Sequence, residues 1–95
     1  MEQQMETGAQ ERTVELAWLI NWFREQNPML ASLTDQEMEA ADFFAAEYID
    51  SFGVIMLIEA AEQEFGISFD EDDFQNRAFA RVIGLAGLIR DKQAA

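Results

Sequence analysis

An apolar helical pattern runs between a serine and a glycine near the middle of the chain, and it limits the possible folds more than any other stretch. Ser51 is a good helix N-cap, and Gly66 is a good residue to follow a helix end. The positions between them place apolar side chains at i, i+3, i+4 and i+7. We therefore expect one amphipathic helix with a serine hydroxyl at its N-terminal end. Its core-facing stripe consists of Val54, Leu57, Ile58, Ala61 and Phe65.

The opposite side of this helix carries a mixed surface. Large apolar side chains lie beside the serine, and carboxylates lie further along the helix. A face of this kind suits a protein partner better than it suits water alone. The residues are Phe52, Ile55 and Met56, followed by Glu59, Glu62 and Gln63.

Composition allows one domain and indicates the kind of partner. The 95 residues are 49% apolar, which is enough for a single modest core. The net charge is −13, from 19 acidic and 6 basic residues. From Glu25 to the residue before Arg77 there are fourteen Asp or Glu and no Lys or Arg. We expect a basic protein surface as partner and no nucleic acid, since such a surface repels phosphate backbones; a purely solubilising surface is the alternative.

The chain has no Cys and no His, so it cannot form a thiol nucleophile, a Ser-His-Asp relay or a zinc site of the usual ligands. We therefore expect a protein that is not an enzyme. Its polar, acidic start does not resemble a secretory signal, and its longest apolar run, Val82 to Ile89, is too short to cross a bilayer. We expect a cytoplasmic protein without membrane insertion.

The segments before the central helix also predict helices. Residues 1–12 are polar, and we expect them to be a disordered N-terminal segment. Thr13 is a suitable cap for a helix to about Gln26, which Asn27-Pro28 ends. Thr34 to Glu37 has the form of a capping box. The first helix should bury Leu16, Leu19, Ile20 and Phe23, and its other side carries Val14, Trp18 and Trp22, to be covered by a loop or by a partner.

The connection to the central helix and the segments after it predict further packing elements. Asp42-Phe43-Phe44 is interpreted as an aromatic anchor for the long connection, or else as ordinary loop packing. The acidic segment that starts at Asp70 predicts a short helical turn. It is not an EF-hand loop, because its sixth position is Gln75 and its twelfth is Arg81. A last helix is expected from about Phe79 to Arg90, with Phe79, Val82, Leu85, Ala86 and Ile89 as its buried stripe.

These features together resemble a known family, the small acyl or peptidyl carrier proteins that bear a phosphopantetheine arm. The resemblance covers about residues 13–91. Its Asp-Ser-Phe form is similar to the stand-alone D-alanyl carrier proteins as much as to the fatty-acid carriers. The matching segments are Asp42-Phe43-Phe44, Asp50-Ser51-Phe52 and Glu64-Phe65-Gly66-Ile67. Two positions depart from the pattern: Glu47 replaces a common glycine, and Gly53 replaces a larger residue.

The resemblance implies an all-α fold over residues 13–91, a small four-helix bundle with a long first loop and a short third helix. It implies that Ser51 carries a covalent 4′-phosphopantetheine arm, attached from coenzyme A by a separate phosphopantetheinyl transferase that uses Mg²⁺. The arm would carry an acyl or aminoacyl group as a thioester between loading ligases or synthases, and we expect a monomer. The residues expected to meet the transferase and these partners are Asp50, Phe52, Ile55, Met56, Glu59, Glu62 and Glu47.

Two other functions compete with this interpretation. The chain would be a non-enzymatic acidic adaptor for a basic protein if Ser51 served only as a helix cap. A small enzyme using Asp72 and Asp73 has little support, because adjacent residues on a helix point about 100° apart and do not converge. The identity of the cargo stays open, since the loading enzyme selects it.

Overall fold

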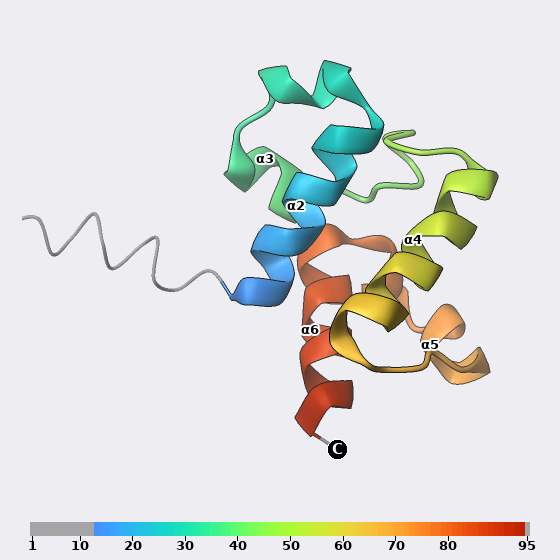
Figure 1. Cartoon of the computed structure of the whole chain (residues 1–95). Coiled ribbons are helices and arrows are strands. Elements are labelled where there is room, and N and C mark those ends of the chain that lie inside the picture. The colour runs from blue at the N-terminus through green and yellow to red at the C-terminus, as the bar shows by residue number, and fades with distance from the viewer. Residues whose placement is uncertain (1–12, 95) are drawn as a thin grey trace, which may run out of the picture.

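The computed structural model describes residues 13–94, and within this range the chain is helical with no strand (Figure 1). The prediction of an all-α fold is confirmed. The expected disordered segment at residues 1–12 lies outside the described residues. In chain order the elements are α2 (Val14–Gln26), η1 (Pro28–Ser32), α3 (Asp35–Ala40), α4 (Ser51–Phe65), α5 (Glu71–Gln75), η2 (Arg77–Ala80) and α6 (Val82–Ala94), where η marks a 3₁₀ turn.

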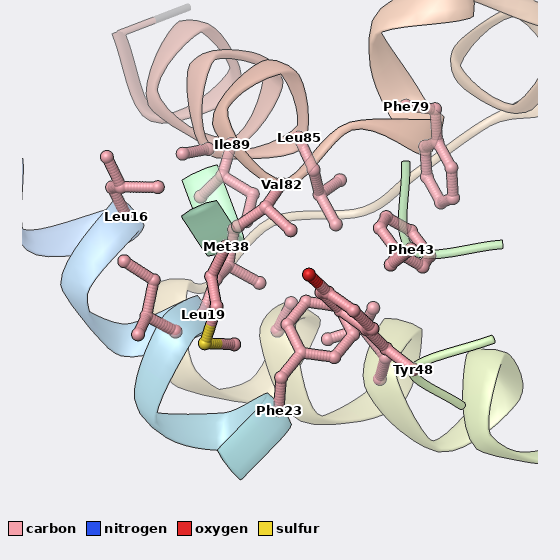
Figure 2. Packing of buried hydrophobic residues seen from close by; sticks show 14 of the residues in the cluster. Leu16, Leu19, Phe23, Met38, Phe43, Tyr48, Phe79, Val82, Leu85 and Ile89 are labelled. Atoms are coloured by element: carbon pink, nitrogen blue, oxygen red, sulfur yellow. The ribbon is translucent and has the colours of Figure 1, made fainter. Parts of the chain in front are cut away.

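Helix α2 begins and ends where the sequence predicts. The Thr13 hydroxyl accepts a hydrogen bond from the Leu16 N–H at 3.2 Å, and Asn27 is the C-cap before Pro28. The predicted apolar stripe is buried and packs against α6 at the centre of the molecule. Figure 2 shows Leu16, Leu19 and Phe23 of this stripe in the shared core.

The core joins residues from every long helix and from the connection between α3 and α4. Its largest fully buried side chains are Phe23, Phe43, Leu19, Met38, Leu57, Leu85, Ile89 and Val82. In α4 the predicted stripe is only partly buried: Leu57 and Ala61 are buried, and Val54, Ile58 and Phe65 are half-buried against the core. The reason is that α4 lies at one edge of the molecule, as Figure 1 shows.

The long connection is partly helical, as the capping box predicts. The Thr34 hydroxyl accepts from the Glu37 N–H at 3.1 Å, and the Glu37 carboxylate accepts from the Thr34 N–H at 2.8 Å. Arg24 of α2 then ties α3 to the bundle through an ion pair of 2.7 Å with Asp35. The connection is therefore a structured part of the fold.

The last helix differs from the prediction at both ends, because it runs from Val82 to Ala94 instead of from about Phe79 to Arg90. Phe79 is buried but lies in the 3₁₀ turn η2, which the Asn76 side chain starts by accepting from the Ala78 N–H at 2.9 Å. The turn packs closely on α6, since a Cβ at Gly84 would lie 2.2 Å from the Ala78 carbonyl oxygen.

The two tryptophans of α2 are half-buried and covered by the same chain. The Trp18 ring meets the Phe65 ring of α4 edge to face, with centroids 5.3 Å apart. The Trp22 ring packs on Phe23 at 5.6 Å. Of the two interpretations that the sequence allows, these contacts favour coverage from within, although α4 rather than a loop covers Trp18.

Candidate functional site

The loop before α4 is fixed by an anchor that includes Phe43. The Asp42 carboxylate accepts hydrogen bonds from the Phe44 and Ala45 N–H groups at 3.0 and 2.9 Å. Phe43 is fully buried, and its ring lies 5.1 Å from that of Phe23. Phe44 stacks on Phe43 from outside and is 45% exposed. The interpretation of this segment as an anchor is confirmed for Phe43, while Phe44 faces the surface.

The turn after this anchor explains why a glycine would suit position 47. The Tyr48 N–H donates to the Phe43 carbonyl and the Glu47 N–H to the Phe44 carbonyl, each at 3.1 Å, which is the pattern that ends a helical turn. Such an ending needs a left-handed residue, and Glu47 has a φ of 58°. Glu47 is exposed, so its carboxylate is presented beside the start of α4.

Asn27 and Tyr48 hold the segment that leads into α4. The Asn27 side-chain amide donates to the Tyr48 carbonyl at 3.2 Å and accepts from the Met29 N–H at 3.1 Å. Tyr48 is buried, and burial raises the pKa of its phenol, with a further rise from the nearby Glu37 carboxylate. Sequence reasoning used Asn27 only as a helix end, because its partner lies 21 residues away.

Asp50, and not Ser51, is the N-cap of α4. The Asp50 carboxylate accepts from the Gly53 N–H at 2.8 Å, and its carbonyl accepts from Val54 at 3.0 Å. The predicted cap is therefore wrong by one residue: both side chains suit the position, but Asp50 reaches the third N–H of the helix. Ser51 is the first helical residue, and it is exposed. Gly66 ends α4 with a φ of 65°, as predicted.

Gly53 allows a close approach at the same helix end. A Cβ on this residue would lie 2.8 Å from the Cβ of Ile49, so a larger residue would push the incoming chain away from the first turn. The structure therefore explains this departure from the family pattern by the close packing of a neighbouring segment.

The start of α4 has the properties that a phosphodiester on Ser51 requires. Within residues 13–94 the N–H groups of Ser51 and Phe52 have no hydrogen-bond partner, and they lie at the positive end of a 15-residue helix. Such groups favour an anion by about 0.3–1 kcal/mol. The residues present therefore fit a 4′-phosphopantetheine group, which would supply a terminal thiol for thioester formation.

A hollow lies beside Ser51, and we call it the Ser51 groove. Its volume is about 670 Å³, and it lies between the C-terminal end of α2, the connection, and the first turn of α4. Its lining includes side-chain amides, carboxylates and apolar side chains but no Lys or Arg. The residues are Gln26, Asn27, Phe44, Glu47, Tyr48, Ile49, Asp50, Ser51, Phe52, Gly53 and Met56.

The outward face of α4 is apolar near Ser51. The exposed fractions of Phe52, Ile55 and Met56 are 68%, 55% and 39%, so the three residues present an apolar contact next to the serine. Glu59 is exposed further along. Glu62 differs, because it is half-buried and one carboxylate oxygen accepts from the Phe69 N–H at 2.9 Å. Glu62 therefore also holds the segment after α4.

The acidic residues after α4 stabilise the fold by capping α5 and by pairing with α6. Asp70 caps α5 and forms a reciprocal capping box with Asp73. Asp73 also pairs with Lys92 of α6 at 2.7 Å. Residues 13–94 contain no group of three or more Asp or Glu arranged to hold a metal ion, and none of the helices in this range is long and apolar enough to cross a membrane.

Comparison with protein families identifies the chain. Residues 29–88 match the family model described as phosphopantetheine attachment site. Searches of curated proteins and of solved structures gave no match. The matched range includes the anchor, Ser51 and the whole of α4. The chain therefore belongs to the phosphopantetheine-bearing carrier proteins, non-catalytic helical domains that carry thioester-linked intermediates on a covalent 4′-phosphopantetheine arm.

Proposed function

We propose that Ser51 is the residue to which the arm is attached. The observation that supports this most directly is an exposed hydroxyl on the first residue of α4, beside two N–H groups without partners among the described residues. Attachment joins the Ser51 oxygen to the phosphorus of the arm, and the nucleotide part of coenzyme A leaves. A serine hydroxyl is a weak nucleophile, and the chain has no His, so the transferase must supply the base.

Recognition by the transferase and the loading enzymes is the protein's own task. Carrier proteins of this family are modified by phosphopantetheinyl transferases and meet loading enzymes. We propose that Glu47, Asp50 and Glu59, together with Glu62, face Arg and Lys on those partners. Phe52, Ile55 and Met56 would fill a shallow apolar contact. Contacts led by charge form quickly and weaken with salt, which suits a shuttle that must leave again.

The Asp50-Ser51-Phe52 form supports a finer proposal, that the chain is related to the stand-alone D-alanyl carrier proteins and takes an aminoacyl cargo. We also propose that the carrier domain comprises residues 13–91 and acts as a cytoplasmic monomer. Incubation of the arm-bearing protein with ATP and an adenylating D-alanine ligase tests the cargo. A mass gain of one alanyl residue supports the proposal, and loading by fatty-acyl or malonyl enzymes alone would contradict it.

Attachment is tested by intact mass after incubation with coenzyme A, Mg²⁺ and a promiscuous transferase. The parent chain should gain one arm, and Ser51→Ala should gain none while its helical circular dichroism stays unchanged. Ser68→Ala is the matched control, because Ser68 is also exposed and its side chain makes no hydrogen bond within residues 13–94. It should be modified like the parent.

Modification of Ser51→Ala at the parent's rate would show that the arm is attached elsewhere. No modification of the parent by several transferases, together with binding of a basic protein, would favour the acidic adaptor instead.

A further inference from the structure

The Ser51 groove, of about 670 Å³, is larger than the hollows beside Trp18 (about 550 Å³) and beside Ile83 (about 180 Å³), and the attachment serine is part of its lining. We propose that the arm, once attached, folds back into this groove and rests against the end of α2. This inference depends on the proposed attachment at Ser51. It goes beyond attachment, because it names a site on the carrier's own surface where the attached arm lies when no partner is bound.

The lining matches the chemistry of the arm from its base outward. The arm begins with a phosphodiester, continues with two methyl groups on one carbon and a hydroxyl, and then has two amides. The anionic base would lie at the unpaired N–H groups of Ser51 and Phe52. Apolar surface for the methyl groups comes from Phe52, Met56 and Phe44, all within the groove lining.

The amides of the arm would meet the end of α2. Both polar atoms of the Asn27 side chain are already used, by Tyr48 and by Met29. Gln26 lies beside it, is exposed, and has no hydrogen bond to its side chain in the described part of the chain. An amide side chain of this kind can donate to one arm carbonyl and accept from one arm N–H. Gln26 is therefore the residue best placed to hold the arm.

The aromatic side chains of the segment that follows α4, and Lys92 of α6, already have partners within the chain. The Phe74 and Phe79 rings meet edge to face with centroids 5.2 Å apart, and Phe69 packs on Phe79 at 5.6 Å. Lys92 lies over the Phe69 ring at 5.9 Å and pairs with Asp73. An arm that extended to this segment would meet side chains that already have partners, whereas the Ser51 groove beside the attachment residue is open.

The experiment is a filtered nuclear Overhauser measurement on arm-bearing protein whose arm alone carries ¹³C and ¹⁵N. The arm methyl groups should show contacts to the Phe44 and Phe52 rings, and the arm amides to the Gln26 side chain. Intact mass and peptide mapping on the same sample first establish that Ser51 carries the arm.

Matched variants test the contacts. Phe44→Ala should lose the methyl contacts, and Phe74→Ala, a residue with nearly the same exposed fraction (48% against 45%), should keep them. Gln26→Ala should lose the amide contacts, and Gln63→Ala, an exposed glutamine outside the groove, should keep them. Gln26→Ala changes an exposed side chain with no partner in the described range, so this variant should fold. It therefore still tests the resting site if Phe44→Ala fails to fold.

The outcomes separate this inference from the proposed function. An arm on Ser51 that shows contacts to Phe69 or Phe74, or to no side chain, would overturn the resting site and leave the attachment intact. Peptide mapping that places the arm on another residue would overturn both.

Discussion

At the scale of single residues, Glu47 is the most unusual position of the site. Its φ of 58° is a left-handed backbone conformation, which costs a residue with a Cβ roughly 1–2 kcal/mol. The carboxylate is exposed beside the start of α4, where no described contact requires it. Strain kept at a residue of this kind is consistent with a role in partner recognition.

Glu47→Gly should therefore stabilise the fold. The strain is removed, and part of the gain is offset by the greater freedom of glycine in the unfolded chain, so the free energy of unfolding should rise by about 0.5–1 kcal/mol. Urea unfolding followed by circular dichroism measures this change. Glu47→Gln is the control: it keeps the strain, removes the charge, and should leave the stability close to that of the parent.

The same variants separate strain from recognition. We expect both Glu47→Gly and Glu47→Gln to slow modification by the transferase, because both lack the carboxylate. A Glu47→Gly protein that is no more stable than the parent would show that the turn does not need glycine.

Single residues also show where sequence reasoning reaches its limit at the site. The αL ending at Gly66 could be predicted because few other residues adopt that conformation readily. The cap at the other end could not be assigned, since Asp50 and Ser51 are adjacent and both are preferred caps. The tether from Asn27 to Tyr48 and the Ser51 groove depend on contacts between distant segments, which no local pattern reveals.

At the scale of elements, α6 contains two glycines in opposite situations. A Cβ at Gly84 would lie 2.2 Å from the Ala78 carbonyl, while a Cβ at Gly87 would meet nothing within 4 Å. Gly87→Ala should stabilise the protein by about 0.5–1 kcal/mol through helix propensity. Gly84→Ala should destabilise it by about 1–3 kcal/mol, because backbone must move. Thermal unfolding of both variants measures the difference, and equal effects would contradict the close packing of η2 on α6.

The position of α6 explains one error of the sequence reading. The stripe of buried residues was predicted correctly, but Phe79 reaches the core from a 3₁₀ turn. The Val82 N–H donates to the Ala41 carbonyl at 3.1 Å, so it does not continue a helix from Phe79. Periodicity shows which side chains are buried, and it does not show where tertiary hydrogen bonds interrupt the backbone.

The ion pair between α5 and α6 predicts a pH dependence. Burial by itself raises the pKa of Asp73, but the hydrogen bond and charge of Lys92, with help from Asp70, bring it below its usual value. The Asp73 hydrogen bond raises the pKa of Lys92. The stability from Asp73 is therefore complete above its unfolded pKa of about 4 and is lost as pH falls through the lower folded pKa. The stability from Lys92 is complete below about pH 10.4 and is lost as pH rises through the higher folded pKa.

Lys92→Met should lower the melting temperature at pH 7, and this difference from the parent should shrink as the pH falls through the lowered folded pKa of Asp73, because protonation removes the charge that Lys92 pairs with. Melting curves at a series of pH values measure it. Lys92→Arg keeps the charge and should resemble the parent. A difference that stays the same over the whole acid series would mean that Lys92 acts through packing on Phe69 alone.

At the scale of the whole molecule, charge is distributed unevenly. The net charge is −13, and from Glu25 to Asn76 there are only acidic side chains among the charged residues. Of the six basic residues, Arg12 and Arg24 precede this region, and the other four follow it: Arg77, Arg81, Arg90 and Lys92. The connection, α4 and α5 therefore form a continuous acidic part of the chain, which can steer a basic partner toward Ser51.

Glu59→Lys should slow modification by the transferase at low salt by on the order of tenfold, since it reverses a charge on the outward face of α4. The effect should shrink at about 0.1 M salt, where the screening length falls to about 10 Å. Glu62 is left unchanged, because it holds the Phe69 N–H. Glu71→Lys on α5 makes the same charge change elsewhere, and an equal effect from it would show that only total charge matters.

The contact between the long connection and the start of α6 has a practical consequence. The Phe43 N–H donates to the Ala80 carbonyl at 3.0 Å, and Asp42 and Arg81 form an isolated antiparallel bridge. A protease can cut a segment only if the backbone detaches from the rest of the fold. The segment at Asp42 and Phe43 cannot detach without exposing the buried Phe43 side chain. Epitope tags and engineered insertions at Asp42 or Phe43 should therefore unfold the domain, although this segment lies outside every helix and would otherwise be taken for an ordinary linker.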